Sequence, residues 1–369
     1  MTWVWMSLVA ATACSPGDAP GGAPADAASV DAPLATSCPD TPGTMATLAP
    51  GHLVGMDATR LFIEGRAGLQ TWPKRGGVPS PFPSAYAGSG LAISGDSYYW
   101  IAPDGLAIHV TGADGALRRS VPLASRAITL AVAPEGGVYA LTRCLAYDPQ
   151  CPLQGESTIE LILDGAAPPQ TIVIRPAGEI TAIASGPDAL VWWQAASSPQ
   201  ASDRIMKRDP RTGLITPLVD PIGFVGGDGT LLIAGDDLFS SVETAPLVIE
   251  RRSLVDGSLR DSYAIHDEAA GSRTAAYWLA ADGDLYWTEP TAISISSAGA
   301  CPIPTGLFRL RLPAQDLRLI DASAAASRVL IDPEVVYYTY RSVDLCCSGN
   351  GHTCTVPAPV EEVRCYRKP

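Results

Sequence analysis

Residues 91–102 read LAISGDSYYWIA: an apolar run, a Gly-Asp pair, and a second run rich in aromatic residues. This pattern predicts a β-hairpin, because Gly and Asp permit a tight turn and the flanking residues favour extended backbone. Six more stretches combine an apolar run, a turn with Asp, Gly, Pro or Glu, and a β-forming run. They are LVGMDATRLFI from Leu53, LAVAPEGGVYAL from Leu130, IASGPDALVWW from Ile183, FVGGDGTLLIA from Phe224, WLAADGDLYWT from Trp278 and VLIDPEVVYYTY from Val329.

The seven copies recur at the spacing of a repeat fold. The first residues of the second runs are Leu61, Tyr98, Val138, Leu190, Leu231, Leu285 and Val335. Successive positions lie 37 to 54 residues apart, and a four-stranded propeller blade typically takes ~40–50 residues. Further β-forming runs follow most copies, and helical periodicity of any length is absent. The sequence therefore predicts an all-β, seven-bladed β-propeller over residues 44–369. A six-bladed ring, with one copy absorbed as a closing sheet, is the alternative.

The last copy is one strand short. Residues 363–367 fit its third strand, and Pro369 is the last residue of the sequence. Residues 44–49, which precede the first copy, look like the fourth strands of other blades. We expect 44–49 to pair with 363–367 and close the ring, because an open seam would leave unpaired strand edges.

The first residues have the composition of an export signal. Residues 1–13 read MTWVWMSLVAATA, an apolar run too short to span a bilayer, which predicts a signal peptide. Residues 11–14, Ala-Thr-Ala-Cys, resemble a bacterial lipobox, which implies lipidation at Cys14. Ala11 replaces the usual bulky residue and no Lys or Arg precedes it, so cleavage by the ordinary signal peptidase is the alternative. Residues 14–43, rich in Ala, Pro and Gly, predict a flexible tether.

The composition restricts the class of protein and of partner. With 47% hydrophobic residues, 35 Gly and 33 Pro, the chain is neither a helical bundle nor disordered. Its formal charge of −13, with no basic run, disfavours nucleic acid as a partner. No apolar run after the first fourteen residues approaches the ~20 that span a bilayer. We expect a soluble body, a monomer, that meets a membrane only through its lipid anchor.

Eight cysteines besides Cys14 lie in loop-like surroundings. They are Cys38, Cys144, Cys151, Cys301, Cys346, Cys347, Cys354 and Cys365. Their even number indicates disulfides formed in an oxidising compartment. Zinc is the alternative, but Cys347, His352 and Cys354 match no standard zinc spacing.

The predicted blades narrow the disulfide pairing, although sequence alone does not determine it. Cys144 and Cys151 share one loop, which favours a local bridge. Cys38, just before the closing strand, is placed to meet Cys365 in the strand with which that segment pairs. Cys301 lies on the same face as the adjacent cysteines 346 and 347, so a cross-blade bridge to one of them is expected. Cys354 is then left to pair with the other.

One face of the predicted ring carries the insertions. Long segments fall between the second and third strands of four blades, at 142–157, 195–203, 289–305 and 342–361. In a meandering blade these connections all open on the same side. Because function concentrates on loops held by a rigid scaffold, this face is the expected binding face. The candidate binding residues on it are Pro152, Glu156, Gly349, Asn350 and His352.

Motifs for catalysis and for cofactors are missing. The sequence contains no GxSxG, HExxH, GxGxxG or Walker loop, and its four histidines stand alone. Acidic clusters at 236–237, 267–268 and 282–284 fit hairpin turns, in which Asp is favoured, and contain no DxDxDG run. We expect no cofactor or metal, with calcium as the alternative.

Aromatic residues are abundant on the second strands, which suggests a stacking platform for sugars or peptides. Alternation along a strand would bury every other side chain between the blades. Most of these residues should therefore belong to the core, and the better candidates for exposure are Trp72 and one member of each adjacent aromatic pair.

The repeat pattern of residues 44–369 resembles the broad class of bacterial propeller-repeat lipoproteins. The resemblance implies a rigid binding disc and no catalytic residue. We expect a non-enzymatic binding or scaffold protein for a protein or glycan, tethered to the bacterial envelope, with secretion as the alternative location. A propeller-type lyase or hydrolase is the alternative function, and an envelope spacer is a third. The enzyme hypothesis places its site in the central channel, at Thr129, Thr181, Arg273, Thr274 and Arg328.

Overall fold

The computed structural model describes residues 37–83, 90–144, 156–165, 167–175, 179–196, 202–222, 230–242, 248–264, 278–288, 293–296, 299–302, 306–312, 316–321, 327–341 and 361–369. The chain divides into two units, Met1–Leu34 and Ala35–Pro369, and every described residue belongs to the second. The described part consists of strands and their connections. It includes no helix long and apolar enough to cross a membrane.

The strands form seven four-stranded antiparallel sheets, the blades. Blade 1 consists of β2 (His52–Met56), β3 (Arg60–Gly65), β4 (Gly68–Pro73) and β5 (Ser80–Pro81). Blade 2 consists of β6 (Leu91–Ser94), β7 (Ser97–Ile101), β8 (Ala107–Thr111) and β9 (Leu117–Pro122). Blade 3 consists of β10 (Arg126–Val132), β11 (Val138–Arg143), β12 (Ser157–Ile162) and β13 (Gln170–Arg175). Blade 4 consists of β14 (Ile180–Gly186), β15 (Ala189–Gln194), β16 (Asp203–Arg208) and β17 (Ile215–Ile222).

The remaining three blades complete the ring. Blade 5 consists of β18 (Leu231–Ala234), β19 (Asp237–Val242), β20 (Val248–Ser253) and β21 (Leu259–Ala264). Blade 6 consists of β22 (Trp278–Asp282), β23 (Asp284–Thr288), β26 (Leu307–Arg311) and β27 (Asp316–Asp321). Blade 7 consists of β28 (Ser327–Ile331), β29 (Val335–Arg341), β30 (Glu361–Arg367) and β1 (Met45–Pro50). The unit is thus a seven-bladed β-propeller, and the six-bladed alternative is wrong.

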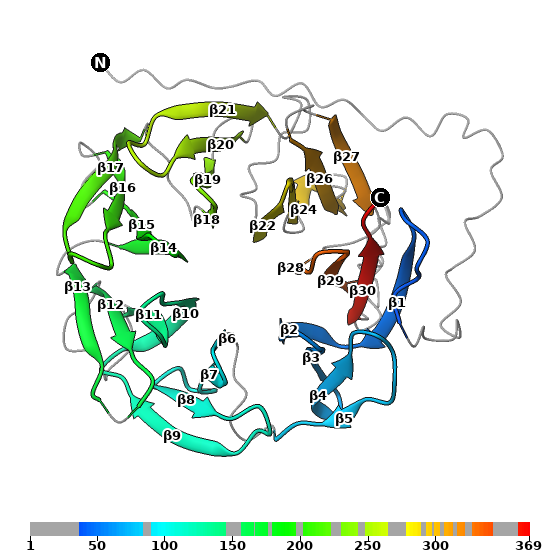
Figure 1. Cartoon of the computed structure of the whole chain (residues 1–369). Coiled ribbons are helices and arrows are strands. Elements are labelled where there is room, and N and C mark those ends of the chain that lie inside the picture. Colours follow the sequence, from blue (N-terminus) through cyan, green and yellow to red (C-terminus); the bar gives the residue numbers. More distant parts are fainter. Residues whose placement is uncertain are drawn as a thin grey trace. The chain divides into compact units, whose positions relative to one another are not determined.

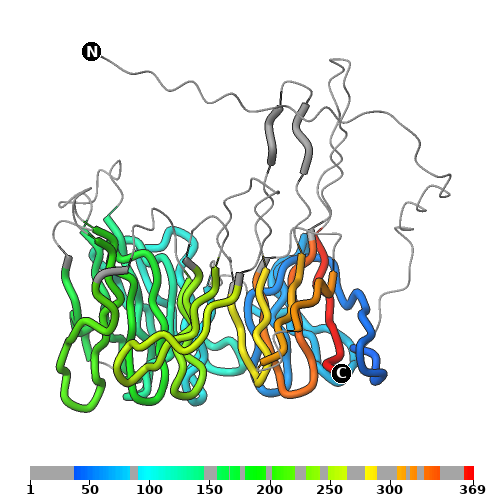
Figure 2. The backbone as a smooth tube through the Cα atoms, turned by 90° about the horizontal axis from the view of Figure 1, so that it is seen from above, coloured from blue at the N-terminus to red at the C-terminus, as the bar shows by residue number. Residues whose placement is uncertain are grey.

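The first strand of every blade lies at the inner edge of the ring, and the fourth strand lies outside (Figure 1). Because the strands alternate in direction, the first-to-second and third-to-fourth turns share one side, which we call the turn face. The turn face runs along the lower edge in Figure 2. The second-to-third connections and the links between blades share the other side, which we call the loop face.

An apolar cluster fills each of the seven contacts between neighbouring blades. Between blades 1 and 2, for example, Phe62 meets the rings of Tyr98 and Trp100 edge-on, at centroid distances of 5.6 and 5.7 Å. Second strands are buried along most of their length, as at Ser97–Ile101. They have strands on both sides within the sheet and a neighbouring blade on each face. The propeller core is therefore a ring of interfaces with no single centre.

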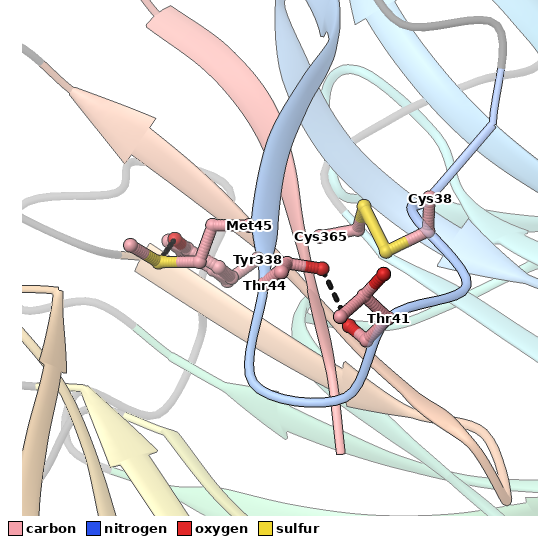
Figure 3. Close-up of a disulfide and its surroundings, with 6 residues drawn as sticks. All are labelled: Cys38, Thr41, Thr44, Met45, Tyr338 and Cys365. Atoms are coloured by element: carbon pink, nitrogen blue, oxygen red, sulfur yellow. Dashed lines mark hydrogen bonds between the residues drawn. A yellow bond between two sulfur atoms is a disulfide. The ribbon is translucent and has the colours of Figure 1, made fainter. Parts of the chain in front are cut away.

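The ring closes where the first and last described segments meet, as the sequence predicted. β1 pairs with β30 from Met45 opposite Tyr366 to Pro50 opposite Glu362. A disulfide joins Cys38 to Cys365 beside this seam (Figure 3). The segment that leads from Cys38 into β1 is also held by hydrogen bonds, including one from the Thr44 hydroxyl to the Thr41 carbonyl at 2.6 Å. Blade 7 is thus built from both ends of the described chain.

One strand assignment from the sequence was wrong. Leu231 was expected to begin the second strand of the fifth copy, but it begins the first strand, β18. The hairpin turn is Gly235-Asp236, with Ala234 opposite Asp237, and Gly235 has a φ of 60° that favours glycine. The sequence contains two possible Gly/Asp turns in this region, one before Leu231 and one at Gly235-Asp236. The predicted hairpin used the earlier turn. The turn that forms matches Gly95-Asp96 of blade 2.

Candidate functional site

The long second-to-third connections leave the loop face at the four positions that the sequence indicated. They join β11 to β12, β15 to β16, β23 to β26 and β29 to β30. Of the predicted binding residues on them, Glu156 is described. Pro152, Gly349, Asn350 and His352 lie outside the described residues, so their binding role stays a prediction.

The connection of blade 3 is held at its base. The Cys144 N–H donates a hydrogen bond to the Glu156 carbonyl at 2.8 Å, which brings its two ends together. Cys144 is 2% exposed and disulfide-bonded. Its predicted partner, Cys151, lies outside the described residues. A backbone hydrogen bond therefore closes this base, and Cys144 within it is also disulfide-bonded.

A buried carboxylate holds the connection of blade 4. Asp203, the first residue of β16, accepts hydrogen bonds from the Trp193 indole N–H at 3.0 Å and from the Ala196 N–H at 2.8 Å. The two donors belong to the end of β15 and to the start of the connection. Asp203 thus joins both ends of the connection through one side chain.

The connection of blade 6 contains a small hairpin of its own, β24 (Ile293–Ser296) and β25 (Gly299–Pro302). Cys301 lies in β25, opposite Ser294. Its expected cross-blade partners, Cys346 and Cys347, lie outside the described residues, as do Cys354 and Cys14. Of the predicted disulfide pairs, Cys38–Cys365 is confirmed.

The inner strands carry three of the five residues assigned to a central channel. Thr129, Thr181 and Arg328 lie on β10, β14 and β28, at the inner edge of the ring (Figure 1). Arg273 and Thr274 lie outside the described residues. Arg328 stands at a β-bulge with a φ of 52°, and burial lowers the pKa of its guanidinium to about 10. Bulges of this kind re-aim side chains and are common beside active sites, but they also occur where they have only a structural role.

The acidic clusters neutralise nearby cations. The ion pairs are Asp237 with Arg251 and Arg260, Asp282 with Lys368, and Asp284 with Arg309. The third cluster, at 267–268, lies outside the described residues. Within the described ranges, no group of three or more His, Cys, Asp or Glu side chains is placed to hold a metal ion.

Both members of each adjacent aromatic pair are buried, so the expected stacking platform is wrong for these residues. The side chains with exposures of 0 to 4% are Tyr98, Tyr99, Trp100, Trp192, Trp193, Tyr286, Trp287, Tyr337 and Tyr338. The reason is that each second strand packs on both faces: Trp192 contacts blade 3 and Trp193 contacts blade 5. Trp72 is half-buried against the cluster between blades 7 and 1.

A pocket of about 970 Å³ opens on the turn face between blades 7 and 1. We call it the seam pocket. Its walls come from the segments around Cys38, Thr59, Lys74, Glu334 and Arg367. Cys38, which is disulfide-bonded to Cys365, thus forms part of one wall. The pocket falls within the ~300–1,000 Å³ that small-molecule sites usually occupy.

Two ion pairs tie the walls of the seam pocket together. The Lys74 ammonium lies 3.1 Å from the Asp332 carboxylate and 5.9 Å from the centre of the Tyr337 ring. Burial alone would raise the pKa of Asp332, but backbone N–H groups and Lys74 hold it below its ordinary value. Arg367 lies 2.9 Å from Glu334. Lys74 comes from blade 1 and Asp332 from blade 7, so the first pair crosses the seam.

Sequence reasoning missed the seam pocket. Its lining comes from five places in the chain, and no local pattern marks any of them. The one usable signal was the expected bond between Cys38 and Cys365, which indicated that the first and last blades meet there. The expected binding face was the opposite one.

Comparisons with known proteins agree with the fold. No protein-family model matches the chain, and no curated protein matches its sequence. Among solved structures, it is similar to the computationally designed Ika8 protein, with a TM-score of 0.52 and 14% identity over 89% of this chain and 95% of that one. The Cps50 (Swd1) β-propeller domain of Myceliophteria thermophila gives a TM-score of 0.55 and 11% identity, over 88% and 99%. A prolyl endopeptidase gives 0.54 and 13%, over 85% and 50%. At such identities the likeness concerns the fold alone.

Proposed function

We propose that this protein is a non-enzymatic binding scaffold that is exported, tethered to the cell envelope through Cys14, and holds a protein or glycan on its loop face. The observation that carries the proposal is the position of the long connections. All four leave the same face of a rigid ring, and at two of them, in blades 3 and 4, the base is fixed by described contacts. A rigid scaffold lowers the entropic cost of ordering loops when a partner binds.

Two observations support export. The ring is sealed by a buried disulfide, and Cys144 belongs to another. Stable disulfides form in oxidising compartments and are rare in the cytosol. The lipobox-like sequence supports lipidation at Cys14, which is tested separately. In cells fed an alkyne-labelled fatty acid, the protein should become labelled and the Cys14→Ala variant should not.

Site-specific crosslinking tests the binding face. A photo-crosslinking amino acid replaces Glu156 at the base of the blade 3 connection in the full chain. The matched control carries it in place of Thr212, which is exposed in a turn of blade 4 on the turn face. After irradiation with an envelope extract, crosslinked proteins and glycans are identified by mass spectrometry.

The expected result is a species enriched from position 156 and absent from position 212. Alanine substitution of residues 348–353 should reduce its yield severalfold, because these residues belong to the connection between β29 and β30, whose described ends lie on the same face. Equal crosslinking from both positions, or none from position 156, would contradict the proposal. It would shift attention to the alternative, an enzymatic site at the inner edge near Arg328.

A further inference from the structure

The seam pocket contains equal numbers of basic and acidic side chains. Its charged lining consists of three basic and three acidic side chains: Lys74, Arg75, Arg367, Asp40, Asp332 and Glu334. Four of them neutralise one another in the two ion pairs already described. The other two, Arg75 and Asp40, are exposed and form no ion pair or hydrogen bond with the described part of the chain. The pocket therefore presents one guanidinium and one carboxylate with unused binding capacity.

One buried aromatic side chain also borders the pocket. Tyr337 lines the pocket and is 2% exposed. Its hydroxyl has no hydrogen-bond partner among the described residues. Burial raises the pKa of this phenol, so it stays protonated at neutral pH and remains a hydrogen-bond donor. Cys38, Val335 and Pro73 add apolar surface to the same walls.

We propose that the seam pocket binds a small zwitterion, an amino acid or a short peptide with free termini. Its carboxylate would bind the Arg75 guanidinium, whose planar fork matches a carboxylate with two parallel hydrogen bonds. Its ammonium group would bind Asp40, and its body would lie against the apolar part of the lining around Pro73 and Tyr337. The site is separate from the loop face, so the inference does not depend on the proposed scaffold function.

The charges of the seam pocket favour a zwitterion over a ligand with a net charge. A phosphate or dicarboxylate would bring excess negative charge close to Asp40, Asp332 and Glu334, and like charges within one pocket repel each other. A polyamine would meet the same difficulty with the three basic side chains. A ligand with one charge of each sign satisfies both free groups and leaves the existing ion pairs intact.

The disulfide is part of this site. Asp40 lies two residues after Cys38, and the bond to Cys365 holds that segment against blade 7. Reducing the bond would free the wall that carries Asp40 and weaken binding of the zwitterion. By linkage, bound zwitterion would make reduction of the bond less favourable at equilibrium.

Calorimetric titration of the full oxidised chain tests the proposal. The probes are glycine, Gly-Leu and Gly-Gly-Leu, which separate the two charges by increasing distances. N-acetyl and C-amide forms of the best probe lack one charge each. We expect at least one probe to bind, and each blocked form to bind at least ~10-fold more weakly, since each loses a charge-assisted hydrogen bond.

Variants assign the two ends of the ligand. Arg75→Gln should abolish the preference for a free carboxylate, and Asp40→Asn the preference for a free ammonium group. Arg66→Gln is the matched control, because Arg66 is also an exposed arginine of blade 1 but lies in the β3–β4 turn on the loop face. It should leave affinity unchanged. All three positions are on the surface, and thermal unfolding would verify that the variants fold.

Three outcomes would overturn the inference. They are the absence of binding by all three probes, equal binding of the free and blocked forms, and equal effects of Arg66→Gln and Arg75→Gln. Each concerns the turn face alone, so none bears on crosslinking at the loop face.

Discussion

Cys38 and Cys365 are 327 residues apart in the sequence, yet a disulfide joins them with their Cα atoms 5.8 Å apart. The bond ties the segment before β1 to β30, the strand with which β1 pairs. Covalent and hydrogen-bonded closure of the ring therefore act at the same seam. In the unfolded chain the same bond would close a loop of most of the protein, and cross-links that close long loops remove the most unfolded-state entropy.

Replacing Cys38 and Cys365 by Ser should lower the free energy of unfolding by ~2–5 kcal/mol, the usual loss when a native disulfide is removed. Urea denaturation followed by tryptophan fluorescence measures it. Each single substitution should cost about as much as the double one, because either removes the same bond. A double variant that unfolds at the wild-type midpoint would show that hydrogen bonds alone hold the seam.

Acid should weaken the contact between blades 1 and 2. The Asp57 carboxylate accepts hydrogen bonds from the N–H groups of Thr59 and Arg60 at 2.7 and 2.6 Å, and from the Tyr98 hydroxyl at 2.8 Å. Burial alone would raise the pKa of Asp57, but these donors and the Arg60 side chain lower it from 3.8 to about 2.

Because the folded pKa of Asp57 lies below the unfolded one, its contribution is complete above about pH 4 and is lost as the pH falls towards 2. A shift of this size corresponds to roughly 2 kcal/mol. Asp57→Asn should destabilise the protein at pH 7 and flatten its stability profile between pH 4 and 2. Asp316→Asn is the control, since its ion pair with Arg318 is exposed and should contribute little. Parallel profiles for Asp57→Asn and wild type would refute the assignment.

Removing the buried carboxylate of Asp203 should loosen the base of the blade 4 connection. In Asp203→Ala the indole N–H of Trp193 and the N–H of Ala196 lose their acceptor. Leaving such donors unsatisfied costs about 2–4 kcal/mol in total. Asp203→Asn keeps one acceptor oxygen and should lose roughly half as much in urea denaturation. Equal losses for the two variants would indicate that the charge, and not the number of acceptors, matters.

Alanine substitutions at two glycines should distinguish the cost of backbone strain from the cost of a steric clash. Gly213 and Gly257 occupy matching third-to-fourth turns of blades 4 and 5, and both have a φ of 74°. A Cβ on Gly213 would meet open space, whereas one on Gly257 would overlap the Leu218 backbone oxygen of blade 4. Gly213→Ala should therefore cost about 1 kcal/mol, and Gly257→Ala about 3 kcal/mol or more. Similar unfolding midpoints for the two variants would mean that the blade contact yields to the added methyl group.

The strand pattern was predictable because it is local. A hairpin needs turn residues between two β-forming runs, and the stretch at Leu91 contains both within twelve residues. The missing fourth strand of the last copy and the spare strand before the first predicted their pairing, which β1 and β30 make. In the fifth copy the same local rule failed, because Gly235-Asp236 and the Gly/Asp residues before Leu231 are both acceptable turns. Only packing against blades 4 and 6 distinguishes them.

By itself, then, the sequence determined the repeat and the strand that closes the ring, and it favoured seven blades over six, since these depend on turn chemistry and on alternation along each strand. The tertiary structure decided which side chains are available. It buried both Trp192 and Trp193, because a blade has a neighbour on each face. It also brought Asp40, Arg75 and Tyr337 to one pocket. Such residues, distant in sequence, meet only when the ring closes, and no local pattern carries that information.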